Sequence, residues 1–160
     1  MDKILSLEQA NELSQILHKQ NKHIVLVGGC FDLLHIGHIT FLEEARKQGE
    51  ILVILLEADQ TIAKSKGSNR PINTQNDRAK ILAALTSVDY VIKLPDMMND
   101  KSYDDLVITV KPAIIATTRG DKNRVYKERS AGLINAQVID VTPQISDKST
   151  TKLIKLLDEL

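Results

Sequence analysis

One stretch, residues 24–47, constrains the fold more than any other part of the chain. Its first four residues form an apolar run that predicts a short buried strand, and Gly28 and Gly29 end that strand without side chains in the way. After a histidine pair, apolar residues recur at helical spacing, which predicts a helix that Gly49 ends. A glycine turn before a helix start suits a nucleotide phosphate, because the first N–H groups of a helix are unpaired.

The composition limits the class of protein. A chain of 160 residues is expected to form one domain over residues 1–160. Lysine plus arginine equals aspartate plus glutamate at 21 each, which argues against a nucleic-acid-coating protein and is compatible with a small anionic substrate. The single cysteine, Cys30, excludes an internal disulfide and fits a reducing compartment. With no membrane-length apolar run and no signal-peptide region, the expected location is cytoplasmic.

Apolar runs and helical patterns alternate along the rest of the chain. Further continuous apolar runs predict buried strands over 51–56, 90–94, 113–117 and 137–141. Helices are expected to start at the capping residues Ser6, Thr74, Ser102, and Ser149 or Thr150, with ends near 20, 87, 110 and 159. A further helix is expected over residues 124–135. The polar, glycine-containing stretch 64–71 is expected to be an exposed mobile loop. This alternation predicts an α/β fold, a Rossmann-like doubly wound five-stranded parallel sheet with helices on both faces.

Ligands of such a sheet bind at the carboxyl ends of its strands. The loops expected there carry the histidine pair, Lys64, Lys66, Arg70, and the stretches 119–121 and 149–151. The sequence therefore predicts that these polar groups converge on one site.

Several motifs carry a resemblance to a known family. His35-Ile36-Gly37-His38 is the H-x-G-H signature of the nucleotidyltransferase superfamily, and residues 29–35 resemble its cytidylyltransferase-type branch. The stretches that look like the adenylyltransferase domain of bacterial heptose-1-phosphate enzymes are 66–73, 77–79, 82–85 and 88–91. Residues 149–152 are similar to the terminal motif of that group and of glycerol-3-phosphate cytidylyltransferase. The resemblance extends over residues 3–155.

The chain departs from this pattern at three places. The heptose enzymes usually have asparagine where Gly28 or Gly29 stands, and their lysine-glycine-glycine-aspartate-tyrosine run is replaced by residues 117–121. The arginine that precedes the terminal motif in the glycerol-phosphate enzymes is missing, with Gln144 nearby. These departures leave the reaction in place and affect the choice of substrate.

The resemblance implies transfer of a nucleoside monophosphate from a nucleoside triphosphate, preferably ATP, to a phosphorylated acceptor such as a sugar 1-phosphate, with release of pyrophosphate. The residues it assigns to catalysis are His35, His38 and Lys66. Those it assigns to nucleotide binding are Gly29, Cys30, Phe31, Asp32, Gly37, Asp121, Ser149 and Thr150. Arg70, Arg78 and Arg119 are candidates for the acceptor or a phosphate. Mg²⁺ is expected as cofactor, held mainly through the nucleotide phosphates, with no metal site made by protein residues.

Each assignment has a plainer alternative. Lys66 can be a solvated loop lysine, and Arg78 can pair with an acidic side chain. Asp121 can form a turn, and the hydroxyl residues at 149–150 can act only as a helix cap. The basic run of Lys122, Arg124, Lys127 and Arg129 is typical of a solvated helix face, with acceptor-phosphate binding as the alternative.

Competing functions are a cytidylyltransferase for glycerol 3-phosphate or another alcohol phosphate, a tRNA-charging fragment and a non-catalytic nucleotide sensor. The balanced charge and short chain argue against the tRNA-charging fragment, and the intact histidines argue against the sensor. The expected partners are a nucleoside triphosphate and a small phosphorylated substrate, without nucleic acid or membrane, and a homodimer is left open.

Overall fold

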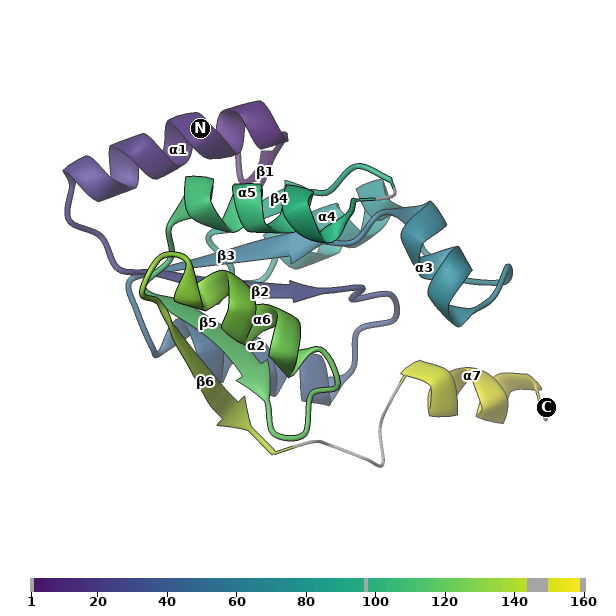
Figure 1. The fold of residues 1–160 in the computed structure, drawn as a ribbon. Coiled ribbons are helices and arrows are strands. Elements are labelled where there is room, and N and C mark those ends of the chain that lie inside the picture. Colours follow the sequence, from purple (N-terminus) through teal and green to yellow (C-terminus); the bar gives the residue numbers. More distant parts are fainter. Residues whose placement is uncertain (1, 97, 144–149, 159–160) are drawn as a thin grey trace.

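The computed structural model describes residues 2–96, 98–143 and 150–158 of the chain. Its central feature is a single parallel sheet, flanked by helices on both faces (Figure 1). In the described residues its strands are β1 (Ile4–Leu5), β2 (Ile24–Gly29), β3 (Ile51–Leu56), β4 (Tyr90–Lys93), β5 (Ile114–Thr118) and β6 (Gln137–Thr142). The helices are α1 (Leu7–Lys19), α2 (Ile36–Arg46), α3 (Asp59–Lys66), α4 (Gln75–Ala83), α5 (Asp100–Val110), α6 (Arg124–Gly132) and α7 (Thr150–Asp158).

The α/β class and the parallel sheet are confirmed, with six strands where five were expected. The additional strand is β1, which pairs with β4 through only two residue pairs, Ile4 with Val91 and Leu5 with Ile92. A two-residue strand contains no repeat of the apolar alternation, so the sequence carried no signal for it.

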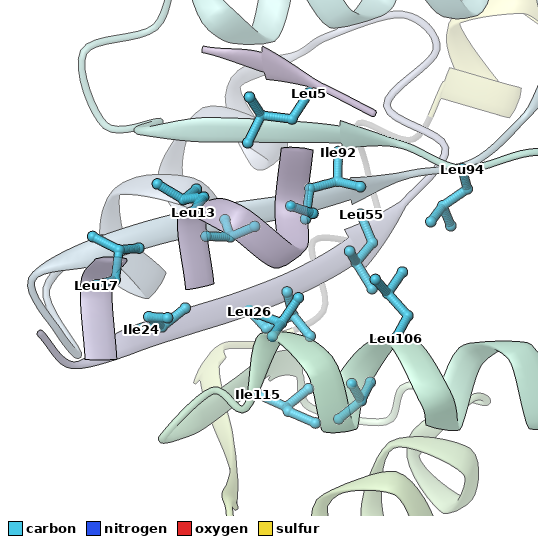
Figure 2. Close-up of a cluster of buried hydrophobic side chains, with 14 of the residues drawn as sticks. Leu5, Leu13, Leu17, Ile24, Leu26, Leu55, Ile92, Leu94, Leu106 and Ile115 are labelled. Carbon is cyan, nitrogen blue, oxygen red and sulfur yellow. The ribbon is translucent and has the colours of Figure 1, made fainter. Parts of the chain in front are cut away.

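The central strands are buried on both faces, which explains their continuous apolar runs. In β2, Ile24 and Leu26 face one core cluster, whereas Val25 and Val27 face the other. Helices α1, α5 and α6 contribute to the first cluster, shown in Figure 2, and α2 and α4 contribute to the second. The sheet therefore separates two apolar core layers.

The strand order places a topological switch point beside β2. The order is β1-β4-β3-β2-β5-β6, so the chain leaves β2 towards β3 on one side and later returns to β5 on the other. A crevice at the carboxyl ends of β2 and β5 follows, and ligands of open α/β sheets bind at such a crevice.

The capping residues predicted two helix starts correctly and a third incorrectly. The Ser6 hydroxyl accepts from the Gln9 N–H in a complete capping box, and Thr74 accepts from the Asp77 N–H, as expected. Helix α5 starts earlier than predicted, because Asn99 and not Ser102 caps it. Both residue types are good caps, and Asn99 accepts from both the N–H and the hydroxyl of Ser102.

Other boundaries also differ from expectation. Helix α2 ends at Arg46, short of Gly49, and α4 ends at Ala83 rather than near residue 87. Residues 64–66, expected in a loop, form the last turn of α3, which ends at Gly67 with φ of 103°. Among the described residues, no helix combines the length and apolarity that crossing a membrane requires.

Candidate functional site

A cavity of about 270 Å³ lies at the switch point, where the sequence and the topology both place a ligand. Its lining comes from the end of β2, the loop into α2 and α2 itself, the end of α3 and the segment after it, the end of β5 and the loop that follows, and α6. The lining residues are Gly28, Gly29, Cys30, Phe31, Asp32, His38, Phe41, Lys66, Arg70, Thr117, Thr118, Asp121 and Lys127.

The glycine turn at the end of β2 is shaped around Phe31. A Cβ atom on Gly29 would lie 2.9 Å from the Phe31 ring, closer than carbon atoms approach one another. Phe31 itself has a φ of 45°, in the left-handed region, and its buried ring lies 5.4 Å from the ring of His38. Gly29 is therefore needed for the tight turn that brings Phe31 beneath the histidines.

The two histidines stand at the start of α2 with their ring centroids 3.9 Å apart. His35 is the N-cap, and its Nδ1 accepts a hydrogen bond from the N–H of Gly37 at 3.1 Å. Because that N–H can only donate, neutral His35 carries its proton on Nε2. The Nδ1 of His38 is buried, without a hydrogen-bond partner among the residues described.

The electrostatic environment keeps both rings neutral at neutral pH. Burial, His35 and Lys66 together lower the pKa of His38 to about 4. Burial also lowers the pKa of His35. A bound phosphate would have the opposite effect, because a nearby negative charge favours the imidazolium form. The pair is thus suited to donate N–H groups to an anion and to gain positive charge as the anion binds.

Lys66 reaches the cavity from the last turn of α3. It lies beside the thiol of Cys30, whose pKa is raised by burial more than Lys66 lowers it. Cys30 is therefore a protonated, half-buried thiol at the turn, which agrees with a packing role for its side chain.

Asp32 and Arg70 form a buried pair in the cavity wall. The Arg70 Nε donates to Asp32 at 2.7 Å, and the N–H groups of Ile72 and Asn73 donate to the same carboxylate. Burial alone would raise the pKa of Asp32, but these three donors lower it below its usual value. Asp32 thus ties the segment after α3 to the glycine turn. The Nη2 of Arg70 is buried, and the described residues offer it no acceptor.

Arg78 and Arg119 lie outside the cavity lining. The Arg78 side chain is completely buried, and it donates to the carbonyls of Cys30, Glu57 and Asn73 and to the carboxylate of Asp59. Its guanidinium therefore joins protein segments, as the acidic-partner alternative anticipated. Arg119 has an exposed side chain, and its N–H donates to the carbonyl of Thr142.

Asp121 belongs to a three-residue polar cluster at the end of β5. Its carboxylate accepts from the Thr117 hydroxyl at 2.6 Å and pairs with Lys127 at 2.7 Å. Burial would raise the pKa of Asp121, but Lys127, Thr117 and the N–H of Asn123 hold it below its usual value. Asp121 is therefore ionised and oriented, both as a turn residue and as part of the cavity wall.

A second cavity, of about 350 Å³, opens on the opposite side of the glycine turn, between the sheet and helices α5 and α6. Leu26, Leu55 and Ile115 line its apolar side, and they belong to the core cluster in Figure 2. A polar pair interrupts this surface, since the Tyr103 hydroxyl donates to the carboxylate of Glu57. Burial raises the pKa of both groups.

No feature of the sequence predicted the second cavity. Tyr103 and Glu57 lie 46 residues apart in the chain, and each falls in a segment without a motif. Only the crossover connections of the sheet bring them together, so the sequence carried no signal for their pairing.

Cations and N–H groups, rather than metal ligands, dominate the first cavity. Among the residues described, no group of three or more histidine, cysteine, aspartate or glutamate side chains could hold a metal ion. The carboxylates of Asp32 and Asp121 are already bonded to protein donors. This donor set fits the oxygens of an anion such as phosphate. Ser149 and the side chain of Thr150, expected to bind nucleotide, lie outside the described part of the chain.

Comparison with known proteins agrees with this geometry. The family model described as cytidylyltransferase-like matches residues 26–156. The chain is 38% identical over 157 residues to the "Bifunctional protein HldE" of Aliarcobacter butzleri and 36% identical over 153 residues to that of a Nitratiruptor species. It spans 98% and 95% of its own length in these matches but only 31% of each relative.

Solved structures show the same fold. The lipopolysaccharide core biosynthesis protein from Thermoplasma volcanium is 30% identical, with a TM-score of 0.62 over 79% of this chain and 99% of that one. A pantoate-beta-alanine ligase from Francisella tularensis, only 16% identical, has a TM-score of 0.66 over 99% of this chain and 77% of that one, a likeness of fold alone. With its family model, its histidine motif and its cavity in agreement, the chain belongs to the cytidylyltransferase-like family.

Proposed function

We propose that residues 1–160 form one nucleotidyltransferase domain that transfers adenosine monophosphate from ATP to a sugar 1-phosphate and releases pyrophosphate. The observation that carries the proposal is the pair of neutral histidines at the start of α2, next to a glycine turn at the switch point of the sheet. Unpaired donors at a helix start favour phosphate oxygens.

The reaction needs positioning and charge stabilisation more than proton transfer. A phosphomonoester has a second pKa of about 6, so the acceptor is largely dianionic near neutrality and needs no general base. An oxygen of the acceptor phosphate forms a bond to the α-phosphorus. The bond from that phosphorus to the bridging oxygen breaks, and its electron pair leaves with pyrophosphate. The protein's part is to align the two phosphates and to stabilise the charge that develops.

Four side chains are placed for that work. His38 lines the first cavity, whereas His35 lies outside its lining, with its ring 3.9 Å from that of His38 and the proton of its neutral ring on Nε2. Lys66 projects into the same cavity. Arg70 lines it as well, and its Nη2 has no acceptor in the described residues, so a phosphate oxygen would satisfy a buried donor. Mg²⁺ bound to the triphosphate would add charge neutralisation at the leaving group.

The two cavities give the substrates separate places. We assign the nucleotide to the first, which contains His38 and Lys66, and the acceptor to the second, which contains the pair of Glu57 and Tyr103. Hydroxyl groups of a sugar suit that pair, since a carboxylate accepts and a phenol both donates and accepts hydrogen bonds.

The choice of ATP and of a sugar phosphate rests on likeness to relatives. Residues 66–91 resemble the heptose-1-phosphate adenylyltransferases, and the HldE proteins are 32–38% identical to this chain. The chain spans about a third of those relatives' length. The proposal therefore includes none of the relatives' other activities, substrates or partners.

The test is a panel of nucleoside triphosphates against phosphorylated acceptors, scored by release of pyrophosphate. The acceptors include sugar 1-phosphates, glycerol 3-phosphate and flavin mononucleotide. A wrong base leaves backbone groups unpaired, so ATP is expected to exceed CTP by about tenfold or more in kcat/KM. Equal or better use of CTP would replace this proposal with the cytidylyl alternative, and no release with any pair would refute nucleotidyl transfer.

A further inference from the structure

The four basic residues near the start of α6 lie in different environments. They are Lys122, Arg124, Lys127 and Arg129. Arg124 pairs with Glu128 and Asp140 on the surface. Arg129 pairs with Asp100 at 2.9 Å and with Asp104 at 3.1 Å. Lys122 is exposed and lies outside both cavity linings. The remaining member, Lys127, points inwards.

Lys127 is held in place by two contacts. Its Nζ lies 2.7 Å from the carboxylate of Asp121, and it donates to the hydroxyl of Thr117 at 3.0 Å. An ammonium group has three donors, so one remains for a ligand. Asp121 is itself fixed by Thr117 and by the N–H of Asn123. The side chain of Lys127 is therefore oriented before any ligand binds, with 22% of it exposed.

Lys127 differs from the other cations in reaching both cavities. The residues that line both are Gly28, Gly29, Cys30, Asp121 and Lys127. Lys66 and Arg70 line only the nucleotide cavity, and Arg129 lines only the acceptor cavity. Within the described parts of the chain, Lys127 is thus the one lysine or arginine at the junction.

The proposed reaction requires two phosphates to meet at this junction, because it joins the α-phosphate of the nucleotide to the phosphate of the acceptor. Two anions approach each other there, and a cation between them lowers the repulsion. We infer that Lys127 binds the phosphate of the acceptor and that Asp121 and Thr117 hold it in position for that purpose. This inference rests on the proposed function and adds a binding residue to it.

The inference also accounts for a departure in the sequence. Residues 117–121, which replace the lysine-glycine-glycine-aspartate-tyrosine run of the heptose enzymes, contain no lysine. Lys127 brings an ammonium group to the same strand end from the first turns of α6.

The kinetic test compares three variants with the unmodified chain and the best acceptor of the panel. Lys127→Met is expected to raise the KM of the acceptor by about tenfold or more and that of ATP by less than about threefold, since one charged hydrogen bond is lost on one substrate. Lys127→Arg keeps the charge, so its KM for the acceptor is expected to lie between that of Lys127→Met and that of the unmodified chain. Lys122→Met removes one charge from the same region outside both cavities, and it is expected to match the unmodified chain.

A binding measurement makes the test independent of turnover. ADP-glucose has two linked phosphates, one for each side of the junction between the cavities. AMP has only the phosphate that belongs to the nucleotide side. By calorimetry, Lys127→Met is expected to weaken ADP-glucose binding by about tenfold and AMP binding by less than about threefold. Thermal unfolding of the variants checks that the fold is kept.

The outcomes separate the two proposals. If the unmodified chain releases no pyrophosphate with any acceptor, the proposed function fails, while the contrast between ADP-glucose and AMP still decides the role of Lys127. The inference is overturned if Lys127→Met weakens both ligands equally or neither, if the unmodified chain does not bind ADP-glucose, or if Lys122→Met has the same effect.

Discussion

At the scale of single residues, His38 combines two unusual features. Its Nδ1 is buried, with no protein partner in the described residues, and its pKa of about 4 keeps the ring neutral. A buried polar atom without a partner carries a free-energy cost that a ligand can remove. His38 is therefore the residue whose removal is most informative about the chemistry.

Replacing His38 with alanine is expected to lower kcat by about 10²-fold or more, the effect of losing one donor to developing charge. Steady-state pyrophosphate release measures it. His23→Ala is the matched control, because that ring is 76% exposed and pairs with Glu50 away from both cavities. A kcat close to that of the unmodified chain would remove His38 from the catalytic machinery.

The lowered pKa of His38 also predicts a pH dependence of stability. Because the folded value of about 4 lies below the ordinary 6.5, the fold favours the neutral ring. This stabilisation is fully present above pH 6.5 and is lost as the pH falls through the folded pKa. Urea unfolding of the unmodified chain should therefore lose more stability on acidification than unfolding of His38→Gln. Parallel pH profiles would contradict the assigned environment.

At the scale of elements, the segment from α3 to Arg70 has an exposed centre between two anchored ends. Lys66 belongs to the last turn of α3, and Arg70 is anchored to Asp32. The three residues between them, 67–69, are exposed. The expectation of an exposed mobile loop over 64–71 was wrong at its two ends, where a helix and a buried ion pair hold the chain.

Nucleotide binding is expected to slow amide hydrogen exchange in residues 66–69, since phosphates would engage Lys66 and order the exposed turn. Hydrogen exchange with and without ATP and Mg²⁺ measures this, with α1 as an internal reference far from the cavity. The protection is expected to disappear in Lys66→Met. Equal exchange in the presence and absence of ATP would exclude Lys66 from the site.

At the scale of the whole molecule, Arg78 connects four separate parts of the site's framework. It joins the glycine turn at Cys30, the end of β3 at Glu57, the start of α3 at Asp59 and the loop before α4 at Asn73. Its side chain has no exposed surface. One buried guanidinium therefore links the segments that lead to the histidines and to Lys66.

Arg78→Met is expected to reduce the free energy of unfolding by about 3–5 kcal/mol, because it leaves buried acceptors without donors. Chemical denaturation gives the value. Arg119→Met, an exposed arginine outside the cavity, is expected to change it by less than about 0.5 kcal/mol. A similar small effect for Arg78→Met would show that its network contributes little.

The sequence by itself determined the features that depend on neighbours in the chain. Strands buried on both faces are continuously apolar, so the apolar runs in the sequence predicted β2 and β3. Helix caps act over three residues, which made Ser6 and Thr74 predictable. The H-x-G-H motif lies on adjacent residues, and its position after a glycine turn located the first cavity.

Tertiary structure decided which distant groups meet. Asp32 and Arg70 are 38 residues apart, and Arg78 reaches a carbonyl 48 residues away. The sequence showed that Lys127 is basic, but only the packing of α6 against the end of β5 turned it towards both cavities. Such contacts depend on crossover connections and strand order, which local periodicity and capping do not encode.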